Sequence, residues 1–152
     1  MKGKKRLFYW DSHAFLAVFN KEPGCEMYRE VLTLAEKGEV LILTSAITLV
    51  EVVKIKGKEP MRQEDEHAIR EFFEHSYIKV FDVARKLAEE ARKLVWEKKL
   101  DPKDAVHVAT AISAGAEAIH TADHKMTRLS GIGGVTIGEP KGLQMELPPP
   151  AQ

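Results

Sequence analysis

The sequence has only one cysteine, Cys25, among its 152 residues. A single thiol can form no internal disulfide bond and no cysteine-based zinc cluster. No apolar run approaches the roughly 20 residues that span a membrane. The apolar stretch at residues 7–10 stops at Asp11, so it is too short for the core of a signal peptide. We therefore expect a cytoplasmic protein that has no membrane partner.

An excess of either charge is also missing, since 23 Lys and Arg residues balance 23 Asp and Glu residues. Proteins that bind nucleic acid generically are usually basic, because the neutralisation of phosphates drives their affinity. The charge balance disfavours such a generic binder. It remains compatible with a nuclease that has an acidic centre, bridged to the substrate by cations, and a basic rim.

The chain contains neither an internal repeat nor a linker that would divide it. Its length suits one compact domain, and 44% hydrophobic residues are enough to fill one core. We expect a single domain over residues 1–142. The Pro-rich end at residues 143–152 cannot pack as regular structure, and we expect it to be a flexible tail.

Short apolar segments alternate along the chain with longer amphipathic ones, which predicts buried strands alternating with helices. The expected strands are residues 7–10, 40–43, 78–81, 118–121 and 135–137. The expected helices are residues 11–20, 25–37, 64–75, 83–99 and 101–115, a helix between Ser45 and Gly57, and one turn at 126–129. This alternation predicts an α/β protein whose parallel sheet is covered on both faces.

Four acidic residues are placed near the ends of these strands. Asp11 directly follows the first strand, and Glu51 lies about two turns into the helix after the second strand. Asp104 is in the first turn of a helix that Asp101 is expected to cap, and Asp123 comes shortly after the fourth strand. Functional groups of open α/β sheets gather at the carboxyl ends of the strands, so we expect these four carboxylates to meet there.

Carboxylates that share one cleft repel each other, and a divalent cation removes that cost. Hard oxygen ligands favour Mg²⁺ or Mn²⁺ over softer metals. Such a centre can activate water and stabilise charge on a phosphodiester during its displacement. The residues and their chemistry therefore predict a metal-dependent phosphodiester hydrolase, in which the four acids are both the catalytic and the metal-binding residues.

Each acid also has a purely structural explanation. Asp11 could cap a helix, Asp104 could interact with a helix dipole, and Asp123 could stabilise a turn. Glu51 could be a solvated helix position, although the apolar residues around it at 49–53 predict partial burial, which needs a partner or a cation. The joint placement of all four after successive strands favours the functional interpretation.

At these residues the sequence resembles the PIN-domain family, including VapC-like toxins. The matching segments are WDSHAFL at residues 10–16, TSAITLVEV at 44–52, DAVHVATA at 104–111 and HTAD at 120–123. The segments occur in the family's order and at similar spacing. The resemblance extends from residue 7 to residue 137.

The resemblance implies a three-layer α/β/α sandwich with a central parallel sheet of about five strands. It implies an endoribonuclease that cleaves single-stranded RNA with Mg²⁺ or Mn²⁺. Asp11, Asp104 and Asp123 would be the main metal ligands, directly or through water. Glu51 would be a further ligand or would orient the attacking water.

Supporting residues and partners follow from the same resemblance. Ser12 and Thr121 match small hydroxyl positions that support the acidic cluster. VapC-like members form dimers and are inhibited by a small antitoxin, so we expect a homodimer and an antitoxin partner by analogy. The chain lacks a second acidic residue directly after Asp123, where many members have one, and the number of metal ions stays open.

Other polar residues near the acids have less specific patterns. The histidines match no compact zinc motif, and we expect them on helix surfaces or in hydrogen bonds. They are His13, His107, His120 and His124. Three cations could contact RNA phosphates at the rim or could be solvated. They are Lys54, Lys125 and Arg128. We expect Trp10 in the core, and Trp96 in the core or at an interface.

Three alternative functions remain to be weighed. A response-regulator-like phosphoacceptor needs paired acids after the first strand, where only Asp11 stands. A non-catalytic PIN-fold module that binds RNA or protein would usually have lost acidic residues, whereas this chain keeps all four. A housekeeping RNA-processing nuclease would share the chemistry but not the antitoxin. We favour the toxin of a VapBC-type pair, because the chain is short and has little beyond the domain.

Overall fold

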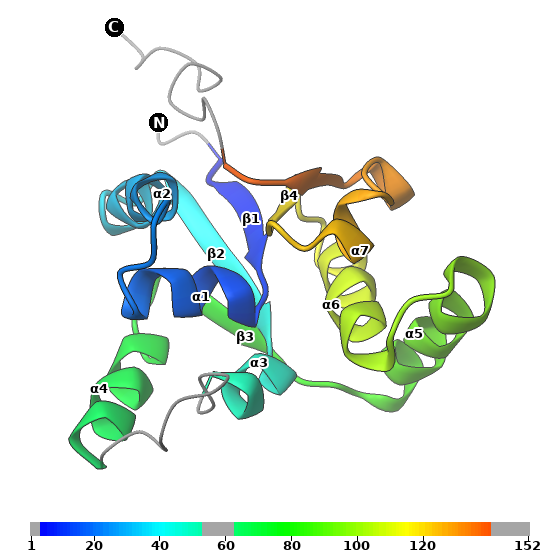
Figure 1. Cartoon of the computed structure of the whole chain (residues 1–152), viewed down its shortest axis with the longest axis horizontal. Coiled ribbons are helices and arrows are strands. Elements are labelled where there is room, and N and C mark those ends of the chain that lie inside the picture. The colour runs from blue at the N-terminus through cyan, green and yellow to red at the C-terminus, as the bar shows by residue number, and fades with distance from the viewer. Residues whose placement is uncertain (1–3, 53–62, 141–152) are drawn as a thin grey trace, which may run out of the picture.

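A computed structural model describes residues 4–52 and 63–140 of the chain, and within these ranges five strands form one sheet (Figure 1). The strands are β1 (Arg6–Trp10), β2 (Val40–Ser45), β3 (Ile78–Phe81), β4 (Ala118–His120) and β5 (Thr136–Gly138). Their order in the sheet is β3-β2-β1-β4-β5, and every neighbouring pair is parallel. The predicted parallel sheet of about five strands is therefore confirmed.

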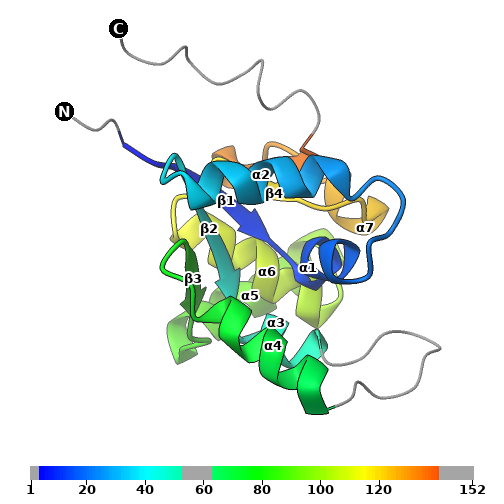
Figure 2. The same cartoon turned by 90° about the vertical axis from the view of Figure 1, so that its left-hand side faces the viewer.

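Helices cover both faces of this sheet (Figures 1 and 2). One face carries α1 (Ser12–Phe19), α2 (Glu26–Glu36) and α4 (Gln63–Phe73). The other face carries α5 (Arg85–Lys98), α6 (Pro102–Ser113) and α7 (His124–Thr127). The short helix α3 (Ala46–Glu51) directly follows β2, and a 3-10 turn, η1 (Ile132–Gly134), precedes β5. The three-layer α/β/α sandwich is confirmed.

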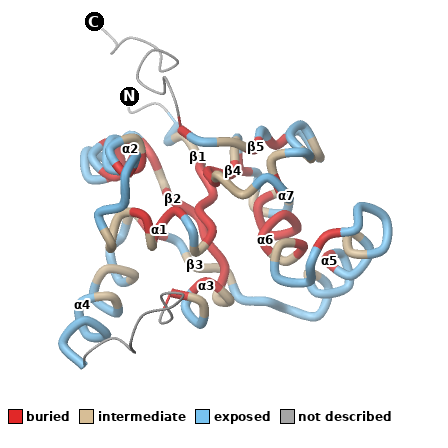
Figure 3. The backbone as a smooth tube through the Cα atoms, viewed as in Figure 1, coloured by how far each residue is buried: buried red, intermediate tan, exposed pale blue. Residues whose placement is uncertain are grey.

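The strands supply two separate cores because successive side chains point to opposite faces of the sheet. On β1, Phe8 and Trp10 are buried in the core beneath α1 and α2, whereas Tyr9 is buried in the core beneath α5 and α6. On β2, Ile42 belongs to the first core and Leu43 to the second. The buried residues form a continuous central band in Figure 3. A central strand buried on both faces explains why its sequence is apolar without alternation.

Of the two tryptophans, only Trp10 belongs to the core. Its ring makes edge contacts with Phe15 of α1 and Tyr28 of α2, at centroid distances of 5.1 and 5.6 Å. Trp96 is 71% exposed on α5, where the guanidinium of Arg92 lies 5.3 Å from its ring centroid. A core position for Trp96 is therefore wrong, because α5 turns this side chain away from the sheet.

Two local predictions need correction. Asp101 occupies the N-cap position of α6, but its side chain makes no capping hydrogen bond, because its carboxylate accepts one from Lys125 instead. The turn predicted at residues 126–129 begins at His124, since Asp123 accepts a hydrogen bond from the amide of Lys125 and so caps α7. The helix break at Gly57 and the predicted tail at 143–152 lie outside the described residues.

No helix within 4–52 or 63–140 combines the length and the apolar character needed to cross a bilayer.

His120 is a buried histidine of β4 that makes stability depend on pH. Trp10 donates its indole N–H to Nδ1 at 3.0 Å, and the imidazole stacks on Phe8. Burial, with a smaller contribution from the charge of Arg6, lowers the pKa of His120 to about 3. Between this pKa and the ordinary value of 6.5, the imidazole is therefore protonated in the unfolded chain but neutral in the folded chain. Stability is lost as the pH falls through that window.

We expect His120 to contribute a loss of about 2 kcal/mol in unfolding free energy between pH 7 and pH 5. His120→Asn keeps an acceptor near the position of Nδ1 but cannot titrate. Urea unfolding of both proteins at both pH values measures the difference. An equal pH dependence in the two proteins would show that His120 is not held neutral.

Candidate active site

The four predicted acids lie around the carboxyl ends of three adjacent strands. Asp11 follows β1, Asp123 follows β4, and Glu51 is the last residue of α3, which follows β2. Asp104 lies in the first turn of α6, which packs against both β2 and β4. The sheet order places β1 between β2 and β4, so segments distant in sequence converge on one edge of the sheet.

Asp11 is the most buried of the four acids, at 5% exposed. Its carboxylate accepts a hydrogen bond from the amide of Ala14 at 3.2 Å and caps α1. Burial raises the pKa of Asp11, although His107, the Thr121 hydroxyl and the Ala14 amide each oppose that shift. An ionised carboxylate here is costly without a further cation, and the Thr121 hydroxyl is one of the groups that reduce this cost.

Asp104 and Asp123 form the more open part of the site. Burial raises the pKa of Asp104, and the negative charges of Asp123, Asp101 and Asp11 raise it further. The amide of Asp123 donates to the hydroxyl of Thr121 at 3.2 Å, which links Asp123 to the same supporting residue. The structure thus brings Asp104 within electrostatic reach of both Asp11 and Asp123, and their negative charges disfavour the ionised form of Asp104.

Glu51 has a different environment, because it is joined to a buried histidine. Its Oε1 lies 2.8 Å from Nε2 of His107, and its Oε2 lies 4.0 Å from the ammonium of Lys103. Burial raises the pKa of Glu51, but the contacts with His107, Lys103 and the Ser12 hydroxyl outweigh that effect, and the pKa lies below its ordinary value. Ser12 thus supports Glu51, and Glu51 is held as a carboxylate.

The burial of Glu51 has a different source from the one predicted. Its neighbours Leu49 and Val50 are exposed, so they do not shield it. Shielding comes instead from α6, through His107. Sequence reasoning treated His107 as one hydrogen-bonded or surface histidine among several, and it missed the specific pairing. The only signal was the position of His107 one turn after Asp104 on the same helix.

The acids fit a hard divalent cation by their chemistry, although they do not enclose one. Across the described parts of the chain, no three His, Cys, Asp or Glu side chains stand close enough together to hold a metal ion. Mg²⁺ commonly keeps several waters and needs only one or two carboxylates. The repulsion of the Asp104 carboxylate by Asp11 and Asp123 is a cost that such a cation would remove. Their assignment as ligands stays a prediction.

The predicted rim cations have protein partners where they are described. Lys125 donates to Asp101 at 3.2 Å, and Arg128 donates to the carbonyl oxygen of Lys98 at 2.6 Å. Lys54 lies outside the described residues. Lys103, which sequence reasoning did not single out, is exposed, and its ammonium lies 4.0 Å from Oε2 of Glu51. The rim of the site therefore includes a lysine of α6.

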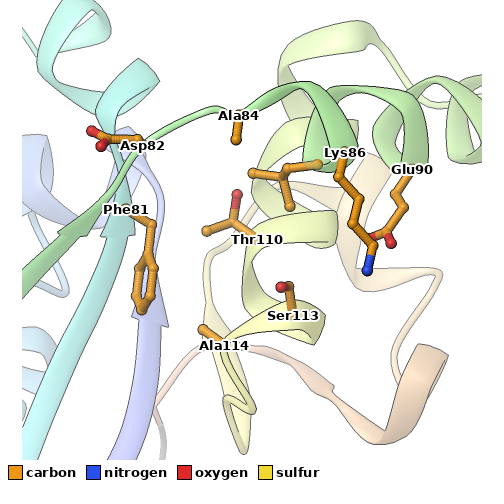
Figure 4. Close-up of a pocket in the computed structure, with 9 residues that line it drawn as sticks. Phe81, Asp82, Ala84, Lys86, Glu90, Thr110, Ser113 and Ala114 are labelled. Atoms are coloured by element: carbon orange, nitrogen blue, oxygen red, sulfur yellow. The ribbon is translucent and has the colours of Figure 1, made fainter.

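A separate pocket of about 260 Å³ lies between the β3–α5 connection and α6 (Figure 4). Its lining includes Phe81, Asp82, Leu87 and Thr110. None of the four predicted acids lines it. The pocket is therefore distinct from the acidic edge of the sheet.

The family model for the PIN domain matches residues 8–132. The chain belongs to the PIN-domain family. The match contains all four acids as well as Ser12 and Thr121. A comparison with curated proteins found no match.

Solved structures share the PIN fold of this chain. A toxin–antitoxin complex from Klebsiella pneumoniae contains a chain that is 25% identical, with a TM-score of 0.62, over 87% of this chain and 96% of that one. VapC20 of Mycobacterium tuberculosis, a toxin that cleaves the sarcin–ricin loop, is 15% identical with a TM-score of 0.61, over 76% of this chain and 89% of that one. A chain of VapBC2 from Rickettsia felis, bound to a promoter DNA fragment, is 21% identical with a TM-score of 0.59, over 86% of this chain and 96% of that one.

Proposed function

We propose that this PIN domain is a metal-dependent endoribonuclease that hydrolyses phosphodiester bonds in single-stranded RNA. The observation that carries the proposal is the electrostatic coupling of Asp11, Asp104 and Asp123 at the carboxyl edge of the sheet. A fold gains nothing in stability from placing the charges of Asp11 and Asp123 where they raise the pKa of Asp104, so this convergence is better explained by a bound cation. The likeness to VapC20, which cleaves an RNA loop, supports RNA as the substrate.

Asp11, Asp104 and Asp123 would hold Mg²⁺ or Mn²⁺, which supplies a polarised phosphate and an activated water when it is bound. The protein itself fixes these carboxylates. The Ala14 amide and the Thr121 hydroxyl orient Asp11. The Thr121 hydroxyl also accepts a hydrogen bond from the amide of Asp123. Glu51, kept ionised by its partners, is the group able to accept a proton or orient water beside them. The exposed Lys103 is placed to meet a phosphate at the rim.

The biological role that we propose is the toxin of a VapBC-type toxin–antitoxin pair. The likenesses to the Klebsiella complex and to VapBC2 support a small antitoxin as a partner. A homodimer is part of the same proposal. A small antitoxin-like reading frame directly upstream of the gene would support the toxin, and its absence would favour an RNA-processing nuclease.

The decisive test is cleavage of labelled single-stranded RNA by the purified protein in Mg²⁺, Mn²⁺ or EDTA. Asp104→Asn keeps the size of the side chain and removes one charge from the cluster. We expect a loss greater than the roughly 100-fold typical when a partner that supports a metal ligand is changed. Asp82→Asn is a matched control, because Asp82 also follows a strand of the sheet but is exposed and is not one of the four predicted acids.

Cleavage that requires metal and survives only in the control variant would establish the nuclease and its centre. Equal cleavage by wild type and Asp104→Asn would contradict the assigned site. If no RNA is cleaved while calorimetry detects no metal binding, the chain is instead a non-catalytic PIN-fold module.

A further inference from the structure

A buried chain of hydrogen bonds links the middle of the sheet to Glu51. The hydroxyl of Tyr9 on β1 lies 2.7 Å from Nδ1 of His107 on α6, and Nε2 of the same ring lies 2.8 Å from Oε1 of Glu51 on α3. Tyr9 is fully buried and His107 is 2% exposed. One imidazole therefore connects three elements through both of its nitrogens.

The direction of these hydrogen bonds follows from the acid at one end. The pKa of Glu51 is lowered, because its contacts with His107, Lys103 and Ser12 outweigh the opposing effect of burial, so its carboxylate can only accept. Nε2 of His107 must then carry the proton. In the neutral ring Nδ1 is bare and accepts from Tyr9. The pKa of Tyr9 is raised well above its ordinary value, first by burial, so its hydroxyl keeps the proton that it donates.

The two ends of this chain differ in how firmly they are held. Tyr9 belongs to the central strand, with β2 and β4 on either side, and its ring packs edge-on against His107 at a centroid distance of 5.7 Å. Glu51 is the last residue of α3, a helix of only six residues, and its two preceding neighbours are exposed. The partners of the Glu51 carboxylate therefore come from other elements: Ser12 of α1, and Lys103 and His107 of α6. Of the two partners on α6, Lys103 is exposed and His107 is buried, so His107 is the firmer constraint.

We propose that His107 is a positioning residue that holds Glu51 by Oε1, with its own ring fixed by the Tyr9 hydroxyl, so that Oε2 faces the acidic centre. This inference rests on the proposed nuclease function for its kinetic consequence, but its geometry stands apart from that function. A free glutamate would adopt several rotamers and would lose the orientation that proton transfer or ligation needs. His107 acts on the reaction only through Glu51.

Two conservative variants distinguish the hydrogen bond at Nδ1 of His107 from the one at Nε2. His107→Gln places an amide near the position of Nε2, and it can still donate to Glu51. His107→Asn places an amide near the position of Nδ1, where it can meet Tyr9 but cannot reach Glu51. We expect His107→Asn to lower kcat by roughly 10- to 100-fold with KM little changed, because the effect lies in orientation and not in RNA binding. We expect His107→Gln to recover most of that loss.

A spectroscopic measurement tests the geometry without using activity. Imidazole nitrogen chemical shifts of the metal-free wild-type protein, with His107→Gln used to assign the His107 signals, report which nitrogen carries the proton. We expect a proton on Nε2, the nitrogen that faces Glu51. In Tyr9→Phe we expect the Nδ1 signal to shift towards the value of a nitrogen that accepts no hydrogen bond. The absence of a proton on Nε2 of the wild-type protein would overturn the proposal.

The outcomes keep this inference apart from the proposed function. If the wild-type protein cleaves RNA but His107→Asn and His107→Gln are equally impaired while folded, the positioning role is wrong and the nuclease stands. If the wild-type protein cleaves no RNA, the proposed function fails, and the nitrogen shifts still decide the hydrogen-bonded geometry. Full activity in His107→Asn would also overturn the positioning role.

Discussion

Replacing Trp10 with alanine should remove about 3–5 kcal/mol of unfolding free energy, the cost typical of deleting a large buried aromatic side chain. Trp10 is fully buried on the central strand, where it contacts Phe15 and Tyr28 and donates a hydrogen bond to His120. Its removal leaves a cavity in the core beneath α1 and α2, and it leaves the acceptor of His120 without a partner. Natural domains have about 5–15 kcal/mol of unfolding free energy in total, so this loss is a large fraction of the stability expected for the protein.

Trp96→Ala is the matched control, since the second tryptophan is 71% exposed. We expect it to change stability by no more than about 0.5 kcal/mol. Urea unfolding followed by far-ultraviolet circular dichroism measures both variants without relying on tryptophan fluorescence. Similar losses in the two variants would show that Trp10 does not hold the core together as its contacts indicate.

Asp11→Asn should abolish metal-dependent RNA cleavage and at the same time stabilise the metal-free protein. Asparagine keeps an oxygen that can cap α1 through the Ala14 amide, so the helix start is preserved. It removes a buried charge whose pKa is raised by burial, and with it the cost of ionising that group at neutral pH. We expect cleavage to fall by more than roughly 100-fold.

Thermal unfolding with and without Mn²⁺ tests whether Asp11 binds the cation. The wild-type protein should gain stability from the cation by mass action, whereas Asp11→Asn should gain little. Asp82→Asn serves again as the control and should behave as the wild type. A metal-free Asp11→Asn protein that is less stable than the wild type would mean that Asp11 is a structural cap whose charge favours the fold.

The fold was largely predictable because β-strand and helix patterns are local properties of the sequence. The strand at Val40 and the helix opened by Pro102 each have an apolar pattern and a clear start signal. For the same reason Asp11 and Asp123 could be expected shortly after strands, where the structure has them. The strand order was not available from these patterns alone, because a parallel sheet is joined by long crossovers that do not record which strands become neighbours.

Side-chain partners were the part that the sequence could not supply. The pairing of His107 with Glu51 joins residues that are 56 positions apart, and no local pattern encodes it. Asp101 looked like a helix cap, yet the approach of Lys125 from α7 gives its carboxylate another partner. Trp96 is a large apolar residue of the kind found in cores, but α5 packs so that this side chain faces outward. Each miss depends on tertiary contacts.

The central position of the first strand also sets when the acidic centre can exist during synthesis. β1 leaves the ribosome first, but its pairing with β4 joins residues 110 positions apart, as in the bond from Trp10 to His120. Until that late segment emerges, Asp11 has neither Thr121 nor Asp123 beside it. Pairing over such long separations forms slowly, because the chain must first close a large loop. In a nascent or truncated chain the four acids therefore cannot come together, and they converge only when nearly the whole domain has been made.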